Sequence, residues 1–189
     1  MKLSFSNFFT TVFSVCILLF AFSCAEDEVT GCTDPDAENY NVNAVTDSGN
    51  CTYASDDLIG TYLGVSECNG SLTNPGFNSS SLNFAVSKAA TGGANDVDVS
   101  FSFESVPFVF SGVVTGDVLV LDDEIMNVSY PNPADPTSTI MVNVEGAATM
   151  TYFDDDMTLD CPNLVLKIKS ANTGATIQEG ACTIIGTKQ

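Results

Sequence analysis

Apolar and polar residues alternate one by one through much of the chain after residue 58. The alternation is clearest in segments 82–86, 97–103 and 164–168, where every second residue is Leu, Ile, Val or Phe. A period of two places one face of a β-strand in a core and the other face in water. No window with a helical period extends beyond one or two turns. Residues 58–189 are therefore predicted to form an all-β domain.

Six further segments have the composition of strands, and turn residues separate them. These segments are 60–67, 108–115, 117–121, 140–145, 148–153 and 178–185. Gly92-Gly93, Gly116 and Gly174 supply the positive φ angles that tight hairpin turns need. Eight or nine successive antiparallel strands leave open edges unless the sheet closes. We expect an antiparallel meander that closes into a small barrel, with a two-sheet β-sandwich as the alternative.

The charged residues are strongly unbalanced and exclude several kinds of site. The 189 residues include 24 Asp and Glu, five Lys and no Arg, His or Trp, which gives a net charge of −19. Without His, neither a His-based catalytic triad nor a His-bound zinc site can form. Five scattered lysines provide no footprint for phosphates, so we expect no nucleic acid partner.

The remaining candidates for catalysis are poorly placed. A Ser-Lys dyad would depend on lysines such as Lys167 and Lys169, which alternate onto the wet face of a predicted strand. Three acidic runs, at 56–57, 122–124 and 154–156, do not resemble the spaced carboxylate pair of a hydrolase. Their like charges favour solvent, so we expect solvated turns in preference to calcium sites or catalytic acids. We predict that the chain is not an enzyme.

Residues 1–23 have the features of a secretory signal peptide. Lys2 precedes an apolar run over 12–22 of about 11 residues, shorter than the roughly 20 that a spanning helix needs. Cys24 follows Ala21-Phe22-Ser23, and this end resembles a bacterial lipobox, in which the Cys becomes the lipidated N-terminus. Cleavage after Ser23 by ordinary signal peptidase is the alternative.

The segment around Cys24 also resembles the start of Bacteroidetes lipoproteins, in which a hydrophobic stretch ends in Ser-Cys and acidic residues follow. Glu26-Asp27-Glu28 stands where those proteins carry a surface-export signal. The resemblance implies a palmitate-bearing lipid on Cys24, an acidic tether over 24–30 and a place on the surface of the cell outer membrane. Two or more acyl chains hold a protein at a bilayer without a spanning helix, so the membrane is an expected partner.

Five cysteines remain after the signal peptide and the lipidated position, in an exported setting where disulfides persist. Cys32 and Cys51 bracket a polar segment and pair most economically with each other. A Cys68–Cys182 disulfide would join the first strand of the β domain to its last and leave Cys161 as a buried free thiol. Cys161–Cys182 is the competing pair.

Residues 31–53 contain too few apolar side chains for a core, so a disulfide must hold them together. Their pattern, G-C-T-D-P-x-A-x-N-Y-N, closely resembles a short Cys-bracketed repeat of secreted and surface proteins in marine Bacteroidetes. The segment is rich in the oxygen donors that Ca²⁺ prefers, although it lacks the EF-hand pattern. Turn capping by the same side chains is favoured over calcium. The candidate calcium ligands are Asp34, Asp36, Glu38, Asn41 and Asp47.

Segments 59–68, 116–121 and 180–183 resemble parts of the lipocalin-like domains of Bacteroidetes lipoproteins. The resemblance implies a small barrel or a strongly coiled sheet over 58–189. A barrel of eight strands either fills with side chains or holds one small ligand. Aromatic residues at alternating positions are more often plain core than pocket lining. The candidate lining residues are Phe84, Phe101, Phe103, Phe108, Phe110 and Phe153.

These observations together predict a cell-surface lipoprotein with a non-catalytic binding domain for a small apolar or amphipathic ligand. The alternative is a structural or adhesive surface protein with a barrel filled by side chains and loops stiffened by calcium. Both functions share the same expected organisation, which is a signal peptide over 1–23, a tether over 24–30, a module over 31–53 and a β domain over 58–189.

Overall fold

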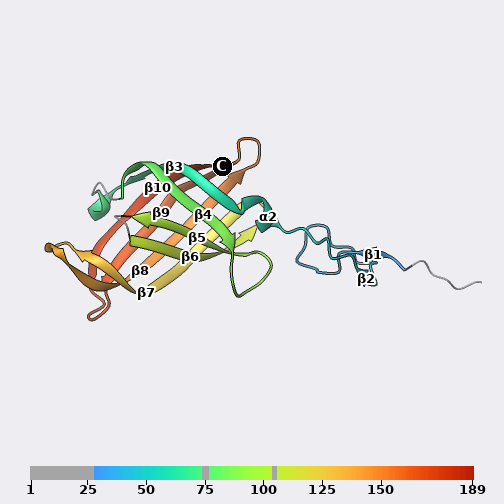
Figure 1. Cartoon of the computed structure of the whole chain (residues 1–189), viewed down its shortest axis with the longest axis horizontal. Coiled ribbons are helices and arrows are strands. Elements are labelled where there is room, and N and C mark those ends of the chain that lie inside the picture. Colours follow the sequence, from blue (N-terminus) through green and yellow to red (C-terminus); the bar gives the residue numbers. More distant parts are fainter. Residues whose placement is uncertain (1–27, 74–76, 104–105) are drawn as a thin grey trace, which may run out of the picture.

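The computed structural model of the chain describes residues 28–73, 77–103 and 106–189. Most of these residues form one β-barrel, and a small disulfide-linked module extends from one end of it (Figure 1). The predicted signal peptide and Cys24 lie outside the described residues.

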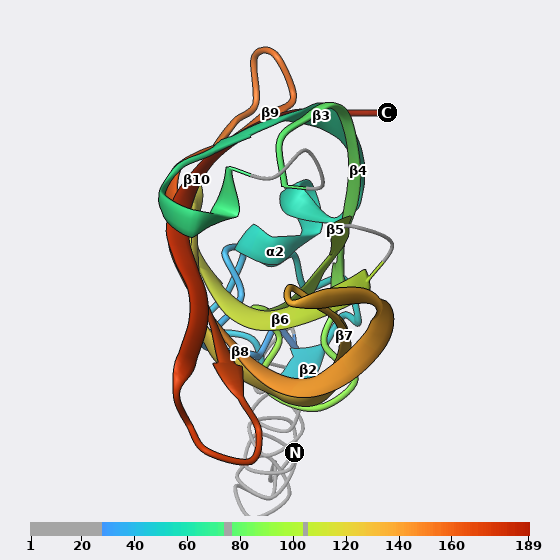
Figure 2. The same cartoon turned by 90° about the vertical axis from the view of Figure 1, so that its left-hand side faces the viewer.

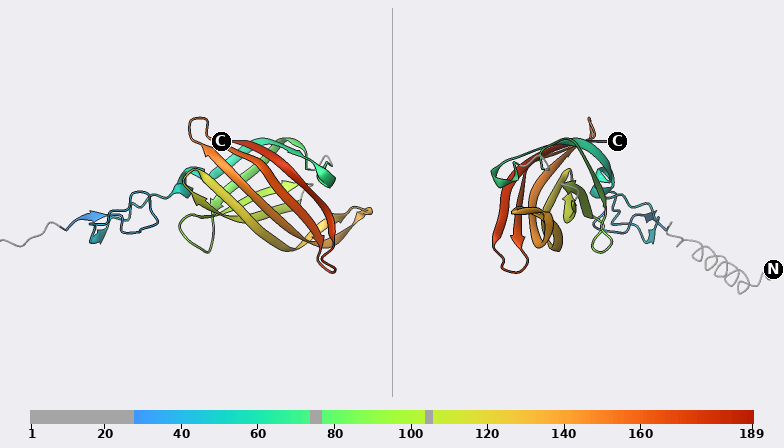
Figure 3. Two further views of the ribbon diagram at one scale, coloured as in Figure 1. Left: turned by 180° about the vertical axis from the view of Figure 1, so that it is seen from behind. Right: turned by 60° about the vertical axis from the view of Figure 1, so that its left-hand side comes forward.

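Eight antiparallel strands form a closed barrel in the order β10-β3-β4-β5-β6-β7-β8-β9. Strands that follow one another in the sequence pair with one another, and β10 pairs with β3 to close the sheet (Figure 3). The predictions of an all-β domain and of a meander that closes are confirmed, and the β-sandwich is wrong. The strands are β3 (Gly60–Cys68), β4 (Ser79–Lys88), β5 (Asp96–Phe103), β6 (Val106–Thr115), β7 (Val118–Asn132), β8 (Asp135–Phe153), β9 (Thr158–Ser170) and β10 (Thr176–Lys188).

The two longest strands, β7 and β8, correct the predicted strand boundaries. β7 continues through the acidic run at 122–124, which we expected in a turn, and β8 contains both 140–145 and 148–153, which we predicted as separate strands. Gly146 lies between those two segments and pairs with Asp123 inside a continuous ladder. A Cβ at position 146 would stand 2.5 Å from Cε1 of Phe110, so this glycine permits a close packing contact and does not mark a turn.

Cysteine pairing agrees with the favoured prediction. Disulfides join Cys32 to Cys51 and Cys68 to Cys182, and Cys161 is a buried free thiol. The competing pair, Cys161–Cys182, is wrong. Cys68 and Cys182 lie opposite each other in the β3–β10 ladder, so the second disulfide joins the two strands that close the barrel.

Two short helices flank β3 in the sequence, and both contribute apolar side chains to the core. α2 (Ala54–Leu58) occupies the predicted joint at 54–57, lies within the ring of strands in Figure 2 and buries Leu58. The acidic pair at 56–57 is therefore helical, and not in a turn as we expected. η1 (Gly70–Leu72) follows β3 and buries Leu72. No helix among the described residues is long and apolar enough to cross a membrane.

The module contains β1 (Thr30–Gly31) and β2 (Thr46–Asp47), which pair in parallel. Its chain then enters α2 directly. Asp56 in the first turn of α2 accepts a hydrogen bond from the backbone N–H of Tyr53 at 2.9 Å, which fixes the start of the helix. The module is thus joined to the barrel at the end that α2 covers.

Candidate functional site

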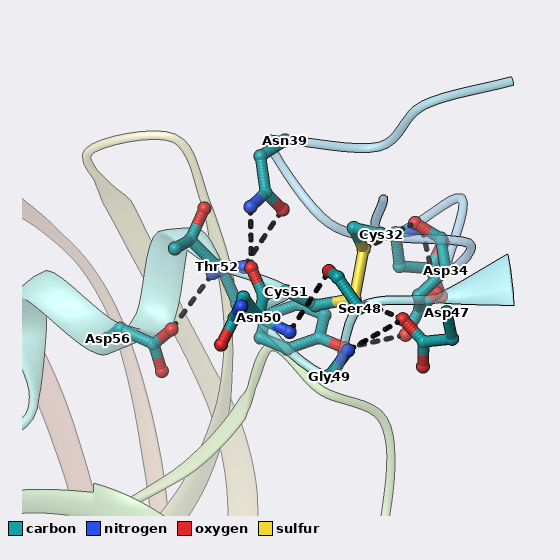
Figure 4. Close-up of a disulfide and its surroundings, with 12 residues drawn as sticks. Cys32, Asp34, Asn39, Asp47, Ser48, Gly49, Asn50, Cys51, Thr52 and Asp56 are labelled. Carbon is teal, nitrogen blue, oxygen red and sulfur yellow. Dashed lines mark hydrogen bonds between the residues drawn. A yellow bond between two sulfur atoms is a disulfide. The ribbon is translucent and has the colours of Figure 1, made fainter. Parts of the chain in front are cut away.

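In the disulfide module, side-chain oxygens of Asp and Asn accept hydrogen bonds that hold the turns (Figure 4). Asp34 accepts hydrogen bonds from the backbone N–H of Asp36 at 3.0 Å and from the hydroxyl of Tyr53 at 2.7 Å. The backbone hydrogen bond, and then the Tyr53 hydroxyl, hold the pKa of Asp34 below its usual value. The same contact with Asp34 raises the pKa of Tyr53.

Two other candidate calcium ligands act in the same way. Asn41 Oδ1 accepts from the N–H of Asn43 at 3.0 Å, and Asp47 Oδ1 accepts from the N–H of Gly49 at 3.1 Å. Asp36 and Glu38 are exposed. No group of three or more Asp, Glu, Cys or His side chains in the described part of the chain is arranged to hold a metal ion. The turn-capping interpretation therefore accounts for Asp34, Asn41 and Asp47.

Aromatic rings from β3 to β6 pack together inside the barrel, and aliphatic side chains fill the rest of its described core. Tyr62 and Phe84 stack with ring centroids 4.9 Å apart, and the ring of Phe101 lies 5.1 Å from that of Phe103 and 5.6 Å from that of Phe110. Five of the six candidate lining residues belong to this core, as the favoured interpretation predicted, and none of the five is more than 6% exposed: Phe84, Phe101, Phe103, Phe108 and Phe110. Three of them, Phe84, Phe101 and Phe108, also line a groove of about 360 Å³.

Phe153 is the sixth candidate, and its expected inward position is wrong. Its side chain is 48% exposed, because Tyr152 takes the inward position at this point of β8. Every buried side-chain nitrogen or oxygen of the described residues has a hydrogen-bond partner. The described interior is therefore apolar, and its buried polar side chains are already hydrogen-bonded.

Cys161 is unsuited to nucleophilic chemistry. The side chain is buried in the barrel core, and this burial raises the pKa of the thiol to about 11. Because the thiolate is the reactive form, the thiol is almost entirely unreactive near neutral pH.

The largest of the grooves that we describe lies on the outer wall of the barrel, over β5, β6 and β7, and has a volume of about 610 Å³. Three valines contribute apolar surface, Val109, Val113 and Val120, and they are 47%, 52% and 46% exposed. Three carboxylates also line the groove: Asp96, Asp98 and Asp122. We call these six residues the valine groove.

A second groove, of about 460 Å³, lies beside the first, and Asp122 lines both. Its other charged residues are Asp123, Glu145 and Lys167. Asp123 accepts a hydrogen bond from the backbone N–H of Ser111 at 2.9 Å, and Glu145 forms an ion pair with Lys169. Asp123 and Glu145 therefore take part in bonds that hold neighbouring strands together.

Two of the three acidic runs lie outside turns, and the third agrees with the prediction. Asp122 and Asp123 belong to β7, Asp56 and Asp57 belong to α2, and residues 154–156 form the turn between β8 and β9. Sequence reasoning missed the valine groove. The signal was present in segment 106–114, in which outward as well as inward positions are mostly apolar.

Comparison with known proteins adds no assignment. No protein-family model matches the chain, and a search of curated proteins finds no match.

Proposed function

We propose that this chain is a lipid-anchored protein of the outer-membrane surface, with a barrel that serves as a non-catalytic binding domain for a small apolar or amphipathic ligand. The anchor is the lipid on Cys24, and the resemblance to Bacteroidetes lipoproteins supports this location. The protein attaches to the membrane through its lipidated N-terminus, and the module and α2 lie between this anchor and the barrel in the sequence.

The valine groove is the observation that carries the binding proposal. A volume of about 610 Å³ lies within the range of roughly 300–1,000 Å³ that is common for small-molecule sites. The groove combines half-exposed valines with carboxylates, which suits an amphipathic ligand. The ligand would bind on the outer wall, because buried aromatic and aliphatic side chains already occupy the described interior.

A structural or adhesive surface protein is the second candidate, and the filled barrel favours it. Ring stacking and two disulfides make a stable body that needs no ligand. The hydrogen bonds of Asp34, Asn41 and Asp47 hold the turns of the module. In this function the module would act as a rigid spacer between the membrane and the barrel.

Fractionation of the host cells tests the anchor. The Cys24→Ser variant should leave the membrane fraction, and the matched Cys16→Ser variant, with the same change inside the signal peptide, should stay in it. Retention of Cys24→Ser in the membrane would refute lipid anchoring.

Native mass spectrometry of the protein purified from its host tests the binding function. We expect a non-covalent small-molecule adduct that survives treatment with a calcium chelator and disappears on denaturation. Bound calcium alone, or no adduct, would favour the structural function.

A further inference from the structure

The three valines of the valine groove form one apolar surface across two strands. Val113 of β6 and Val120 of β7 are direct partners in the antiparallel ladder, so their side chains stand side by side on the outer face. Val109 lies on the same face of β6, four residues before Val113. Covering these half-exposed valines with an apolar body removes their surface from water and so lowers the free energy of the complex.

Carboxylates lie on the strands beside these valines, at paired positions of the sheet. Asp96 of β5 is the ladder partner of Val113, and Asp98 is the partner of Ser111. The hydroxyl of Ser111 donates to Oδ1 of Asp98 at 3.3 Å. Asp122 follows Val120 by two residues on β7, so its side chain points to the same outer face. The acidic groups therefore lie along the sides of the valines, within the same groove.

The charge of the groove restricts what can occupy it. Three Asp and no Lys are among the described residues that line it, in a chain with a net charge of −19. Fatty acids, phosphates and acidic peptides would be repelled by this field. A simple metal ion would leave the valines exposed. The occupant that matches both surfaces has a positive group and an apolar body.

We propose that the valine groove binds a small organic cation with an apolar body. Its ammonium group lies between Asp98 and Asp122, and its apolar part covers Val113 and Val120. This inference rests on the proposed binding function and specifies the ligand class and the surface for it.

Three ligands with the same six-carbon chain isolate the contribution of charge: hexylammonium, hexanol and hexanoate. We would titrate each into the ¹⁵N-labelled mature chain, residues 24–189 with Cys24→Ser, and follow amide chemical shifts. Hexylammonium should shift the amides of β5, β6 and β7 around Val113. It should bind about tenfold more tightly than hexanol, because two carboxylates, each about 5 Å from the ammonium group, attract it even through water. Hexanoate should cause no shift there, and salt should weaken the hexylammonium complex.

Matched variants connect the binding to named residues. The Asp98→Asn/Asp122→Asn protein should bind hexylammonium about tenfold more weakly. The Asp154→Asn/Asp155→Asn protein, with the same charge change in the β8–β9 turn, should bind it as tightly as the unchanged chain. Val113→Thr/Val120→Thr should weaken hexylammonium and hexanol by the same factor, because it removes apolar surface and no charge. Amide spectra of each free variant verify that the barrel is folded.

Each contrary result has a separate meaning. If hexanol or hexanoate binds as tightly as hexylammonium, or if the shifts appear outside the groove, the cation proposal is wrong although the binding function stands. If none of the three causes shifts in the groove, the cation proposal is wrong, and the native mass spectrum then decides the fate of the binding function independently.

Discussion

Cys68 at the end of β3 and Cys182 in β10 lie directly opposite each other, and a disulfide joins them across the pair of strands that closes the barrel. The two residues are 114 positions apart in the sequence. The bond therefore encloses most of the β domain in one covalent loop. The β3–β10 ladder and this disulfide therefore join the same two strands at the place where the barrel closes.

Removal of this disulfide should strongly destabilise the barrel. For the Cys68→Ala/Cys182→Ala protein we expect the free energy of unfolding to fall by about 3–5 kcal/mol, because the unfolded chain regains the entropy of a long loop. Urea titration followed by tyrosine fluorescence measures the change. The Cys32→Ala/Cys51→Ala protein is the control, since that bond lies in the module and its loss should leave barrel unfolding almost unchanged. Equal losses in both variants would show that the barrel does not depend on closure by Cys68 and Cys182.

Lys88 should fix α2 to the barrel. Its ammonium group donates to Ser55 Oγ at 2.8 Å and to the carbonyl of Ala94 at 2.6 Å, and it lies 3.2 Å from a carboxylate oxygen of Asp56. Lys88→Met should lower stability by about 1–2 kcal/mol, a modest value because the ion pair is well exposed. Hydrogen exchange should increase in α2 and in the loop after β4. Lys167→Met makes the same charge change on β9, and equal exchange in the two variants would contradict this role.

The wall between β6 and β7 should be protected against pairing with a foreign strand. The ladder between these strands ends at Gly112 and Leu121, and beyond it Asp123 accepts the N–H of Ser111. Pro107 has no backbone N–H. Its nitrogen lies on the same edge of β6 as the N–H of Ser111, because residues four positions apart in a strand direct these groups to the same side. Proline and inward-pointing acids are devices that protect sheet edges.

The Pro107→Val/Asp123→Val protein should therefore self-associate. Light scattering in 0.5 M salt, which screens the net negative charge, should show a mass that rises with protein concentration. The control Asp155→Val removes one acidic charge in a turn and should stay monomeric. A monomeric double variant would show that this edge needs no protection.

Acid should loosen the module before it affects the barrel. The pKa of Asp34 is lowered in the folded chain, chiefly by the N–H of Asp36 and also by the hydroxyl of Tyr53. Such a group stabilises the fold above its unfolded pKa of about 3.9, and this contribution is lost as the pH falls through the lower folded value. NMR from pH 6 to pH 2 should show module amides shifting with the Asp34 carboxyl. In Asp34→Asn that transition should be absent, and its persistence would assign it to another acid.

The alternation of apolar residues was enough to predict the architecture, because the strand period and the inward face are local properties. Phe101 and Phe103 are inward as predicted, and positive φ angles occur at Gly92, Gly116 and Gly174. Phe153 was assigned to the wrong face, although the inward positions of Ala148 and Met150 already place Tyr152 inside. A shift of one residue reverses the face of a strand side chain.

Other features depend on contacts between distant residues, which local patterns do not contain. Segments 140–145 and 148–153 were predicted as separate strands, yet Gly146 between them lies against the ring of Phe110 of β6, where a Cβ would not fit. The acidic run at 122–124 resembled a turn, yet successive strand residues point to opposite faces, so Asp122 reaches the groove while Asp123 reaches the backbone of Ser111. The candidate site arises from the register of three strands, and it became visible only with the fold.

We propose that the barrel binds its ligand on the outer wall and not in its interior. A crystal structure of the protein purified from its host, with the co-purified ligand retained, tests the place of binding most directly. We predict ligand density over Val113 and Val120, with a positively charged group between Asp98 and Asp122. Density among the rings of Phe101 and Phe108 inside the barrel, or an empty valine groove in a protein that carries a ligand elsewhere, would contradict it.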